Sequence, residues 1–271
     1  MTTATTARLT AGIDVGSTYT KVVLLDHDHH IAGQSVGKTG FKLAEAARRM
    51  YEMALADARA DEREVGYTVA TGYGRFQVEQ ADAHVTDLTA AARGASFLFP
   101  ATRTILDVGG QTMKATRIDD LAKVRSFRLN DKCAAGTGAF LEKTARYMGY
   151  STEEIGTLAE MSKSPAFISG VCAVFAESEV INHLSQGTSP SDIMQGAIQS
   201  LVDRSIQLMR RVQLDPEYTL VGGILRFPSM GRLLIDKLGA SVNVPPPDVV
   251  QLVGALGAAV LGWKRLRQVS G

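Results

Sequence analysis

Residues 9–26 read LTAGIDVGSTYTKVVLLD. Apolar and β-branched residues flank a small polar turn that begins at Gly16, and this pattern predicts a strand, a glycine turn and a second strand. A tight turn of glycine, serine and threonine directs several backbone N–H groups to one point, which favours anion binding. Asp14, at the end of the first strand, is placed to hold Mg2+, because Mg2+ prefers a few carboxylates together with waters and phosphates.

A second copy of this pattern occurs 93 residues further along the chain, where residues 103–118 read RTILDVGGQTMKATRI. Ile13-Asp14-Val15-Gly16 aligns with Leu106-Asp107-Val108-Gly109, and Lys21 then aligns with Lys114 without a gap. Two copies in the same strand–turn–strand context predict a duplicated core with one phosphate loop in each half.

The duplication predicts two lobes with ATP and Mg2+ bound between them. We expect the first lobe to comprise residues 1–100 and 251–271, with the first phosphate loop and a closing C-terminal helix. The second lobe is then 101–250, with the second phosphate loop, both cysteines and a Gly222-Gly223 turn.

The composition is that of an ordinary globular protein of 271 residues, with 45% hydrophobic residues and a net charge of +1. There is no basic excess that would indicate nucleic-acid binding. The N-terminus lacks the apolar core of a signal peptide, and the apolar run 249–263 is shorter than a membrane span requires. We therefore expect a cytoplasmic protein with no membrane partner, in which cysteines are reduced, metal-bound or buried and not disulfide-bonded.

Apolar periodicity and turn residues predict the remaining elements. The predicted helices span 42–60, 88–97, 138–147, 151–159, 174–184, 192–212 and 248–266, and the further predicted strands span 31–35, 65–70, 218–224 and 242–244.

Two other glycine motifs fail on spacing. Gly37-Lys38-Thr39 resembles the end of a Walker A loop, but the first glycine of that loop would fall at Ala32. Gly136-Thr137-Gly138 begins like a dinucleotide-binding fingerprint, but Leu141 occupies the third glycine position. Both interpretations are rejected.

The two cysteines, Cys133 and Cys172, are 39 residues apart and form no CxxC pair. Each is followed by a predicted helix or a helix-opening turn. The N-terminus of a helix carries partial positive charge and free N–H groups, which lower the pKa of a thiol and stabilise anionic ligands. The alternative is that both are inert buried residues.

Three further segments, ATGYGR (70–75), NDKCAAGTG (130–138) and CAVFAESEVI (172–181), give the chain a family resemblance. The order of the motifs resembles the acetate and sugar kinase, heat-shock chaperone and actin superfamily. Within it, these segments resemble the activator ATPases of 2-hydroxyacyl-CoA dehydratases and the ATPase subunits of benzoyl-CoA reductases, which are BadF/BadG/BcrA/BcrD-type ATPases. The resemblance spans nearly the whole chain and implies an α/β, duplicated actin-like ATPase fold.

Two loops depart from the activator pattern. Activators typically read Asp-Ile-Gly-Gly-Gln-Asp at the second phosphate loop, where this chain ends with Thr112. They usually show Gly-Gly-Val-Ala-x-Asn at the adenosine loop, where this chain reads GGILRF over 222–227. These departures favour the small, D-type ATPase subunit of a benzoyl-CoA reductase, with a free-standing dehydratase activator as the alternative.

The resemblance implies an iron–sulfur mechanism. Cys133 and Cys172 would ligate a 4Fe–4S cluster, and because such a cluster normally takes four thiolates, two chains would share it. The second chain would be a homologous ATPase subunit, which we prefer, or another copy. ATP hydrolysis would move the lobes, and the electron would pass from reduced ferredoxin to partner subunits that reduce an aromatic or acyl-CoA thioester, anaerobically.

The candidate residues divide into three groups. Asp14 and Asp107 would organise Mg2+ and its waters, and Gln111 would position the attacking water. The metal ligands would be Cys133 and Cys172. The candidate nucleotide-binding residues are Gly16, Ser17, Thr18, Lys21, Gly109, Gly110, Gly136, Thr137, Gly138, Gly222, Gly223 and Ile224.

Two functions of other classes remain open. A small-molecule kinase of the same fold would have merely buried cysteines, whereas the ATP-driven electron carrier would be brown and bleached by oxygen. A regulatory nucleotide-binding protein would release no phosphate. The sequence does not indicate which acyl-CoA is reduced.

Overall fold

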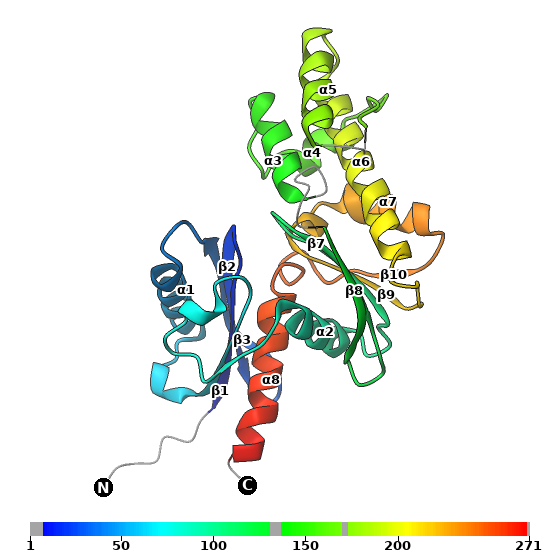
Figure 1. The fold of residues 1–271 in the computed structure, drawn as a ribbon. Coiled ribbons are helices and arrows are strands. Elements are labelled where there is room, and N and C mark those ends of the chain that lie inside the picture. Colours follow the sequence, from blue (N-terminus) through cyan, green and yellow to red (C-terminus); the bar gives the residue numbers. More distant parts are fainter. Residues whose placement is uncertain (1–7, 131–136, 170–172, 270–271) are drawn as a thin grey trace, which may run out of the picture. The chain divides into compact units, whose positions relative to one another are not determined.

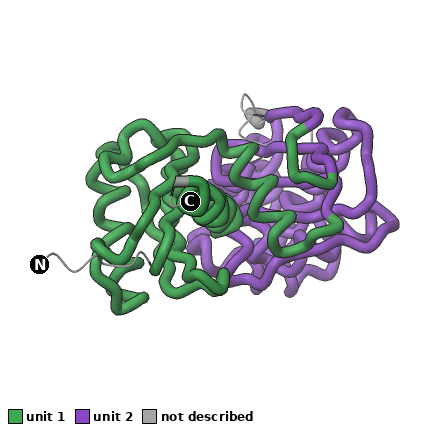
Figure 2. Tube along the Cα trace, turned by 90° about the horizontal axis from the view of Figure 1, so that it is seen from below, with its two compact units in different colours: residues 1–101, 120–124, 252–271 green, residues 102–119, 125–251 purple. Residues whose placement is uncertain are grey.

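The chain forms two compact units in a computed structural model that describes residues 8–130, 137–169 and 173–269. Unit 1 comprises residues 1–101, 120–124 and 252–271, and unit 2 comprises 102–119 and 125–251 (Figure 2). The end of the chain thus belongs to the same unit as its beginning.

Unit 1 is built on a five-stranded mixed sheet with the order β3-β2-β1-β4-β5. β1, β2 and β3 form an antiparallel meander, whereas β4 lies parallel to β1 and β5 parallel to β4. The strands are β1 (Leu9–Val15), β2 (Tyr19–Asp26), β3 (Ile31–Lys38), β4 (Val65–Thr71) and β5 (Ala83–His84).

Helices cover both faces of this sheet. α1 (Leu43–Ala58) packs on the face that carries Ala11 and Leu24, and α8 (Val253–Val269) packs on the opposite face (Figure 1). Because both faces are buried, β1 and β2 are almost continuously apolar. α2 (Asp87–Leu98) packs against α8 so closely that a Cβ on Gly257 would lie 1.9 Å from the carbonyl oxygen of Ala90.

α8 is fixed to the N-terminal strands by backbone contact and by hydrogen bonds. The Thr10 hydroxyl donates to the carbonyl oxygen of Ala259 (2.9 Å), and the indole N–H of Trp263 donates to the carbonyl oxygen of Leu25 (3.0 Å). A Cβ on Gly12 would lie 1.8 Å from the carbonyl oxygen of Ala255, so only glycine allows this approach.

Unit 2 repeats the sheet of unit 1, with the order β10-β9-β6-β7-β8. Read from β8, it matches β3-β2-β1-β4-β5 strand for strand, with the same antiparallel hairpin and the same parallel neighbours. The strands are β6 (Thr104–Val108), β7 (Met113–Ile118), β8 (Val124–Asn130), β9 (Tyr218–Val221) and β10 (Val242–Asn243). The predicted duplication of the core is therefore present.

The helices of unit 2 surround one large core in which α6 is the central element. A serine N-cap at Ser189 and a proline at the first position begin α6, as the sequence predicts. α3 and α5 lie together at one end of the unit (Figure 1). The helices are α3 (Gly138–Tyr147), α4 (Ile155–Glu160), α5 (Ala173–Ser185), α6 (Pro190–Arg210) and α7 (Pro228–Leu238).

Three predicted elements need correction. The predicted helix at 151–159 begins only at Ile155, because Glu154 accepts hydrogen bonds from the backbone and hydroxyl of Ser151 and closes a turn there. The predicted strand 218–224 ends at Val221, since Gly222 has a φ of +103° and a 3-10 turn, η4 (Gly223–Arg226), follows.

The last helix begins at Val253 and not at residue 248. Residues 248–252 form turns, and the carbonyl oxygen of Val250 accepts a hydrogen bond from Gly222 N (3.0 Å). The sequence analysis also did not predict α7 or β8. α7 carries the expected signals, a proline at its first turn and the left-handed cap Gly239 (φ +60°).

Candidate functional site

The first hairpin brings Asp14 and Lys21 together across the β1–β2 ladder. Lys21 Nζ lies 2.9 Å from Asp14 Oδ2, and the two side chains are only 17% and 16% exposed. Gly16 N donates to the carbonyl oxygen of Tyr19 and closes the turn (3.1 Å). A Cβ on Gly16 would lie 3.1 Å from Lys21 Nζ, so the ammonium group lies beside the turn.

Thr39, which directly follows β3, supports this turn. The sequence did not predict this role. Its hydroxyl donates to the carbonyl oxygen of Gly16 (2.8 Å), and its N–H donates to that of Thr18 (2.9 Å). Thr39 belongs to the rejected Gly37-Lys38-Thr39 motif, so that segment contributes to the first hairpin through a different contact. Ser17, at the tip, is exposed.

The second hairpin has the same geometry. Asp107 pairs with Lys114 in the β6–β7 ladder, with 3.4 Å between Lys114 Nζ and Asp107 Oδ2. Gly109 N donates to the carbonyl oxygen of Thr112 (2.9 Å), a backbone contact that does not require an aspartate at this position. Gln111 is exposed at the tip of the turn, where its amide is free of packing.

Each aspartate lies beside a glycine that follows the neighbouring parallel strand. Gly72 (φ +86°) follows β4, and a Cβ there would lie 2.4 Å from Asp14 Oδ1. Gly222 (φ +103°) follows β9, and a Cβ there would lie 2.4 Å from the carbonyl oxygen of Val108 and 2.8 Å from Asp107 Oδ1. The segment 70–75 and the predicted adenosine loop therefore occupy equivalent positions in the two units.

The first turn of α3 contacts both the second hairpin and the adenosine loop. Gly138 N donates to the carbonyl oxygen of Gly109 (2.9 Å), and Ala139 N donates to that of Gly110 (2.8 Å). A Cβ on Gly138 would lie 2.7 Å from Ile224 Cδ1. The structure thus brings together the predicted residues Gly109, Gly110, Gly138 and Ile224, with the fully buried Thr137 preceding α3.

The remaining predicted residues of unit 2 have separate positions. Gly223 begins η4, and a Cβ there would lie 3.5 Å from Gln251 Oε1. Gly136, Cys133 and Cys172 lie outside the described residues. Within residues 8–130, 137–169 and 173–269, no group of three or more histidine, cysteine or acidic side chains could hold a metal ion.

Arg226 and Phe227, of which Phe227 departs from the activator pattern, have packing partners. The Phe227 side chain is buried, and a Cβ on Gly156 of α4 would lie 3.2 Å from it. The guanidinium of Arg226 lies 5.2 Å from the Phe227 ring centroid and 3.9 Å from Glu153. Arg226 and Phe227 therefore connect the adenosine loop to the start of α4.

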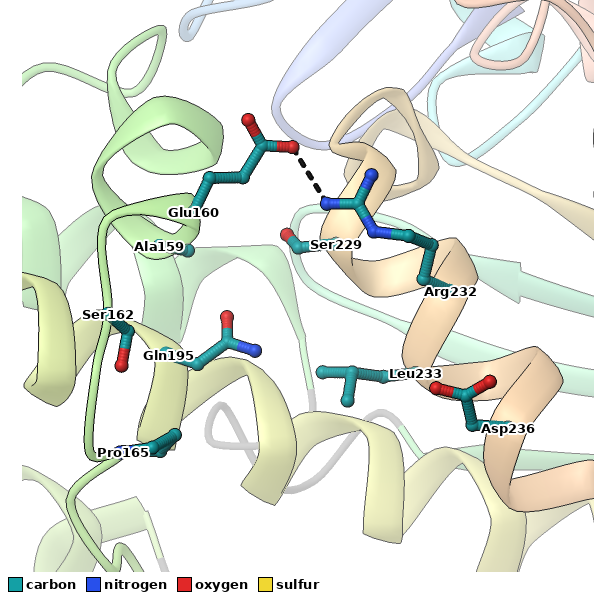
Figure 3. A pocket seen from close by; sticks show the side chains of 9 residues that line it. All are labelled: Ala159, Glu160, Ser162, Pro165, Gln195, Ser229, Arg232, Leu233 and Asp236. Atoms are coloured by element: carbon teal, nitrogen blue, oxygen red, sulfur yellow. Dashed lines mark hydrogen bonds and ion pairs between the residues drawn. The ribbon is translucent and has the colours of Figure 1, made fainter.

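Unit 2 also contains a cavity of about 420 Å³ between α4, α6 and α7 (Figure 3). Glu160 and Arg232 form an ion pair across its rim (2.7 Å), and Ser229 and Gln195 line its interior. None of the predicted nucleotide-binding or metal-binding residues lines this cavity, so it is distinct from the hairpins described above.

Among the described residues, no helix is both long enough and apolar enough to cross a membrane.

Comparison with known proteins identifies relatives along the whole chain. Residues 11–262 match the model of the BadF/BadG/BcrA/BcrD ATPase family. The activator of lactoyl-CoA dehydratase from Anaerotignum propionicum is 39% identical over 94% of this chain and 97% of its own length. The (R)-2-hydroxyglutaryl-CoA dehydratase activating ATPase from Acidaminococcus fermentans is 37% identical over 94% and 97%. The D subunit of benzoyl-CoA reductase from Thauera aromatica is 34% identical over 94% and 93%.

Solved structures agree with the sequence comparison. Component A of the Acidaminococcus fermentans (R)-2-hydroxyglutaryl-CoA dehydratase has a TM-score of 0.90 and 35% identity, covering 96% of this chain and 99% of that chain. The activator of 2-hydroxyisocaproyl-CoA dehydratase from Clostridium difficile, with bound ADPNP, has a TM-score of 0.90 and 34% identity, with 97% of each chain covered. A glucokinase from Streptomyces griseus, at TM-score 0.57 and 14% identity over 94% and 99%, shows the fold alone.

The fold is the duplicated actin-like ATPase fold that the resemblance implied. The two hairpins and the glycine after each parallel strand agree with the match to the family model over residues 11–262. The chain therefore belongs to the BadF/BadG/BcrA/BcrD ATPase family.

Proposed function

We propose that this chain hydrolyses ATP and couples the hydrolysis to delivery of a low-potential electron to a partner enzyme that acts on a CoA thioester. The observation that carries the proposal is the pair of equivalent hairpins, Asp14–Lys21 and Asp107–Lys114, in a chain that matches dehydratase activators over 94–96% of its length. A bound ADPNP in one such relative supports nucleotide binding.

The chain's own residues suit phosphate binding and hydrolysis. Backbone N–H groups of the two turns would bind phosphate oxygens, and Lys21 and Lys114 would add positive charge beside them. Asp14 and Asp107 would hold Mg2+ through its waters. Gln111 would orient the attacking water, a role that an amide performs without a shifted pKa.

The donor set of the chain fits half of a 4Fe–4S cluster. Such a cluster takes four thiolates, and this chain has two cysteines, Cys133 and Cys172. α3 begins five residues after the first cysteine and α5 begins directly after the second. When bound, the cluster would supply one-electron transfer at low potential. Two chains, each giving two thiolates, would complete it.

The relatives support the activator role at least as well as the D-type role. Three activators are 39%, 35% and 37% identical to this chain, and the benzoyl-CoA reductase relative is 34% identical. The D-type role depends on Thr112 and on the adenosine loop. It predicts a homologous ATPase subunit as partner, together with reduced ferredoxin and substrate-reducing subunits, whereas an activator would pair with its own copy.

Anaerobic purification tests the proposal. We expect a brown protein that contains about four irons per dimer and releases phosphate from ATP. An iron-free protein that forms ADP only when an acceptor is present, with the phosphoryl group on the acceptor and no free phosphate, would be a kinase, and one that binds ATP without turnover would be regulatory. Either result would refute the electron-transfer role.

A second experiment separates the two roles. The purified chain, with ATP and a reductant, is mixed either with the dehydratase components that the activators serve or with the substrate-reducing subunits of a benzoyl-CoA reductase. A stable, cluster-loaded homodimer that starts dehydration of a 2-hydroxyacyl-CoA supports the activator role. Activity only beside a second, homologous ATPase subunit supports the D-type role.

A further inference from the structure

Two hydrogen bonds attach the N-terminus of α3 directly to the second hairpin. The N–H groups of a helix's first turn have no partner within the helix, and here those of Gly138 and Ala139 donate to the carbonyl oxygens of Gly109 and Gly110. Because Ile224 fills the space beside Gly138, the start of α3 is also packed on the adenosine loop. A displacement of either loop therefore displaces α3.

An ion pair connects α3 to α5 one turn beyond this attachment. Lys143 Nζ lies 2.6 Å from Glu177 Oε2, and the Glu177 hydrogen bond raises the pKa of Lys143. The Lys143 ammonium also lies 5.7 Å from the ring centroid of Tyr147. Lys143 lies in the second turn of α3 and Glu177 in the second turn of α5, so the ion pair joins the two helices directly.

α5 has a second set of contacts that points elsewhere. Glu179 accepts a hydrogen bond from Ser169 N (2.5 Å), and His183 Nε2 lies 3.0 Å from the carbonyl oxygen of Phe167. Residues two apart on a helix face different directions, so Glu177 faces α3 while Glu179 faces the segment before α5. Glu177 is therefore the member of this acidic pair that can connect the two helices.

We propose that the Lys143–Glu177 ion pair is the contact through which a nucleotide-dependent displacement of the second hairpin passes from α3 to α5. We call this contact the joint. This inference rests on the proposed nucleotide binding and adds the route by which it acts. Helices move as stiff bodies, so a short contact between them passes on a displacement. An ion pair with one member half exposed contributes little to stability, so variants that remove it should still fold.

Amide hydrogen exchange in α5 of the full chain tests the joint, with ADP and ADPNP compared. In the wild-type chain we expect exchange rates within 176–185 to differ by about 5-fold or more between the two nucleotides. Lys143→Glu and Glu177→Lys should each abolish most of that difference without changing ADPNP affinity. The double charge swap should restore it.

A matched control reverses another ion pair of the same unit. Lys237 of α7 pairs with Asp203 of α6, and neither residue belongs to the proposed route. Lys237→Glu should leave the nucleotide response of α5 unchanged. A single Lys143 or Glu177 variant that keeps the response, or a double swap that fails to restore it, would overturn the joint.

The readout separates this inference from the proposed function because it requires no cluster. A wild-type chain that binds both nucleotides without a difference in α5 would overturn the joint alone. A chain that binds neither nucleotide would overturn both.

Discussion

Each aspartate that we propose for Mg2+ binding has a cationic partner on the opposite strand of its hairpin. The side chains of the pairs Asp14–Lys21 and Asp107–Lys114 are more than three-quarters buried, so each charge is compensated by its partner in the hairpin. The lysine holds the carboxylate at the base of the turn. In both units the glycine after the parallel strand leaves the space that the carboxylate occupies.

Gly222 offers the sharpest test at the residue scale. Its φ of +103° and ψ of 157° lie in a region almost confined to glycine, and a Cβ would lie 2.4 Å from the carbonyl oxygen of Val108. We expect Gly222→Ala to lower the free energy of unfolding by about 3 kcal/mol. Chemical denaturation measures this.

Gly239 provides the matched control. It has a φ of +60°, and no neighbouring atom would lie within 4 Å of a Cβ there. Gly239→Ala should cost only about 1 kcal/mol, the penalty of the left-handed conformation itself. Equal losses for both variants would show that contact with the second hairpin is not what requires glycine at 222.

Gln111 tests the hydrolytic role. The side chain is exposed at the tip of the second hairpin and makes no contribution to the buried core. Gln111→Ala should lower kcat for ATP hydrolysis on the order of 100-fold, as loss of a group that acts in the transition state does. Nucleotide affinity, measured by calorimetry, should change far less. An equal loss of kcat and of nucleotide affinity would contradict the water-positioning role.

At the scale of elements, one carboxylate fixes the loop after α4 to the start of α6. Asp192 accepts hydrogen bonds from the hydroxyl of Ser162 (2.7 Å), the N–H groups of Lys163 (2.9 Å) and Ser164 (2.8 Å), and the hydroxyl of Ser189 (2.7 Å). These hydrogen bonds hold the pKa of Asp192 well below its usual range, and the one from the Ser162 hydroxyl has the largest effect.

This depressed pKa predicts the direction of a pH effect. A carboxylate with a lowered folded-state pKa stabilises the protein above its ordinary pKa of about 3.9, and the stabilisation is lost as pH falls through the folded-state value. Asp192→Asn should therefore lower the melting temperature at neutral pH. As pH falls below about 3.9 the difference between the two proteins should shrink, because the unfolded wild-type chain then binds a proton at Asp192 that the folded chain does not.

Asp203→Asn, on the same helix, is the control for this titration. Asp203 contacts a single lysine, Lys237, so its replacement should have a smaller effect at neutral pH. If the melting temperatures of Asp192→Asn and the wild type differ by the same amount in acid as at neutral pH, the charge of Asp192 is not what stabilises this loop.

The elements also show what the sequence could and could not predict. Both hairpins were predictable because their turn, ladder register and Asp–Lys pair lie within 8 consecutive residues. Thr39 and Gly72 were not assigned, because their contacts with the first hairpin depend on how β3 and β4 pair with their neighbours. The Lys143–Glu177 pair likewise depends on the packing of two helices whose paired residues are 34 positions apart.

At the scale of the whole molecule, the proposed cluster ligands Cys133 and Cys172 would couple assembly to electron transfer. If two chains share one cluster, each of Cys133→Ser and Cys172→Ser should remove iron and weaken dimerisation together. Monomer ATP binding should persist, since the hairpins are built from other residues. Iron analysis, sedimentation and nucleotide titration of anaerobically purified protein measure the three quantities. Full iron content in either single variant would refute the shared cluster.

The covering of the β1 sheet by α8 has a consequence for synthesis on the ribosome. Thr10 is translated 249 residues before its partner Ala259, and Leu25 is translated 238 residues before its partner Trp263. At about 5–20 residues per second the delay is roughly 10 to 50 seconds. Until α8 has been translated, one face of β1 and β2 lacks the helix that covers it. A nascent chain that stops before Val253 would therefore expose this apolar face to chaperones.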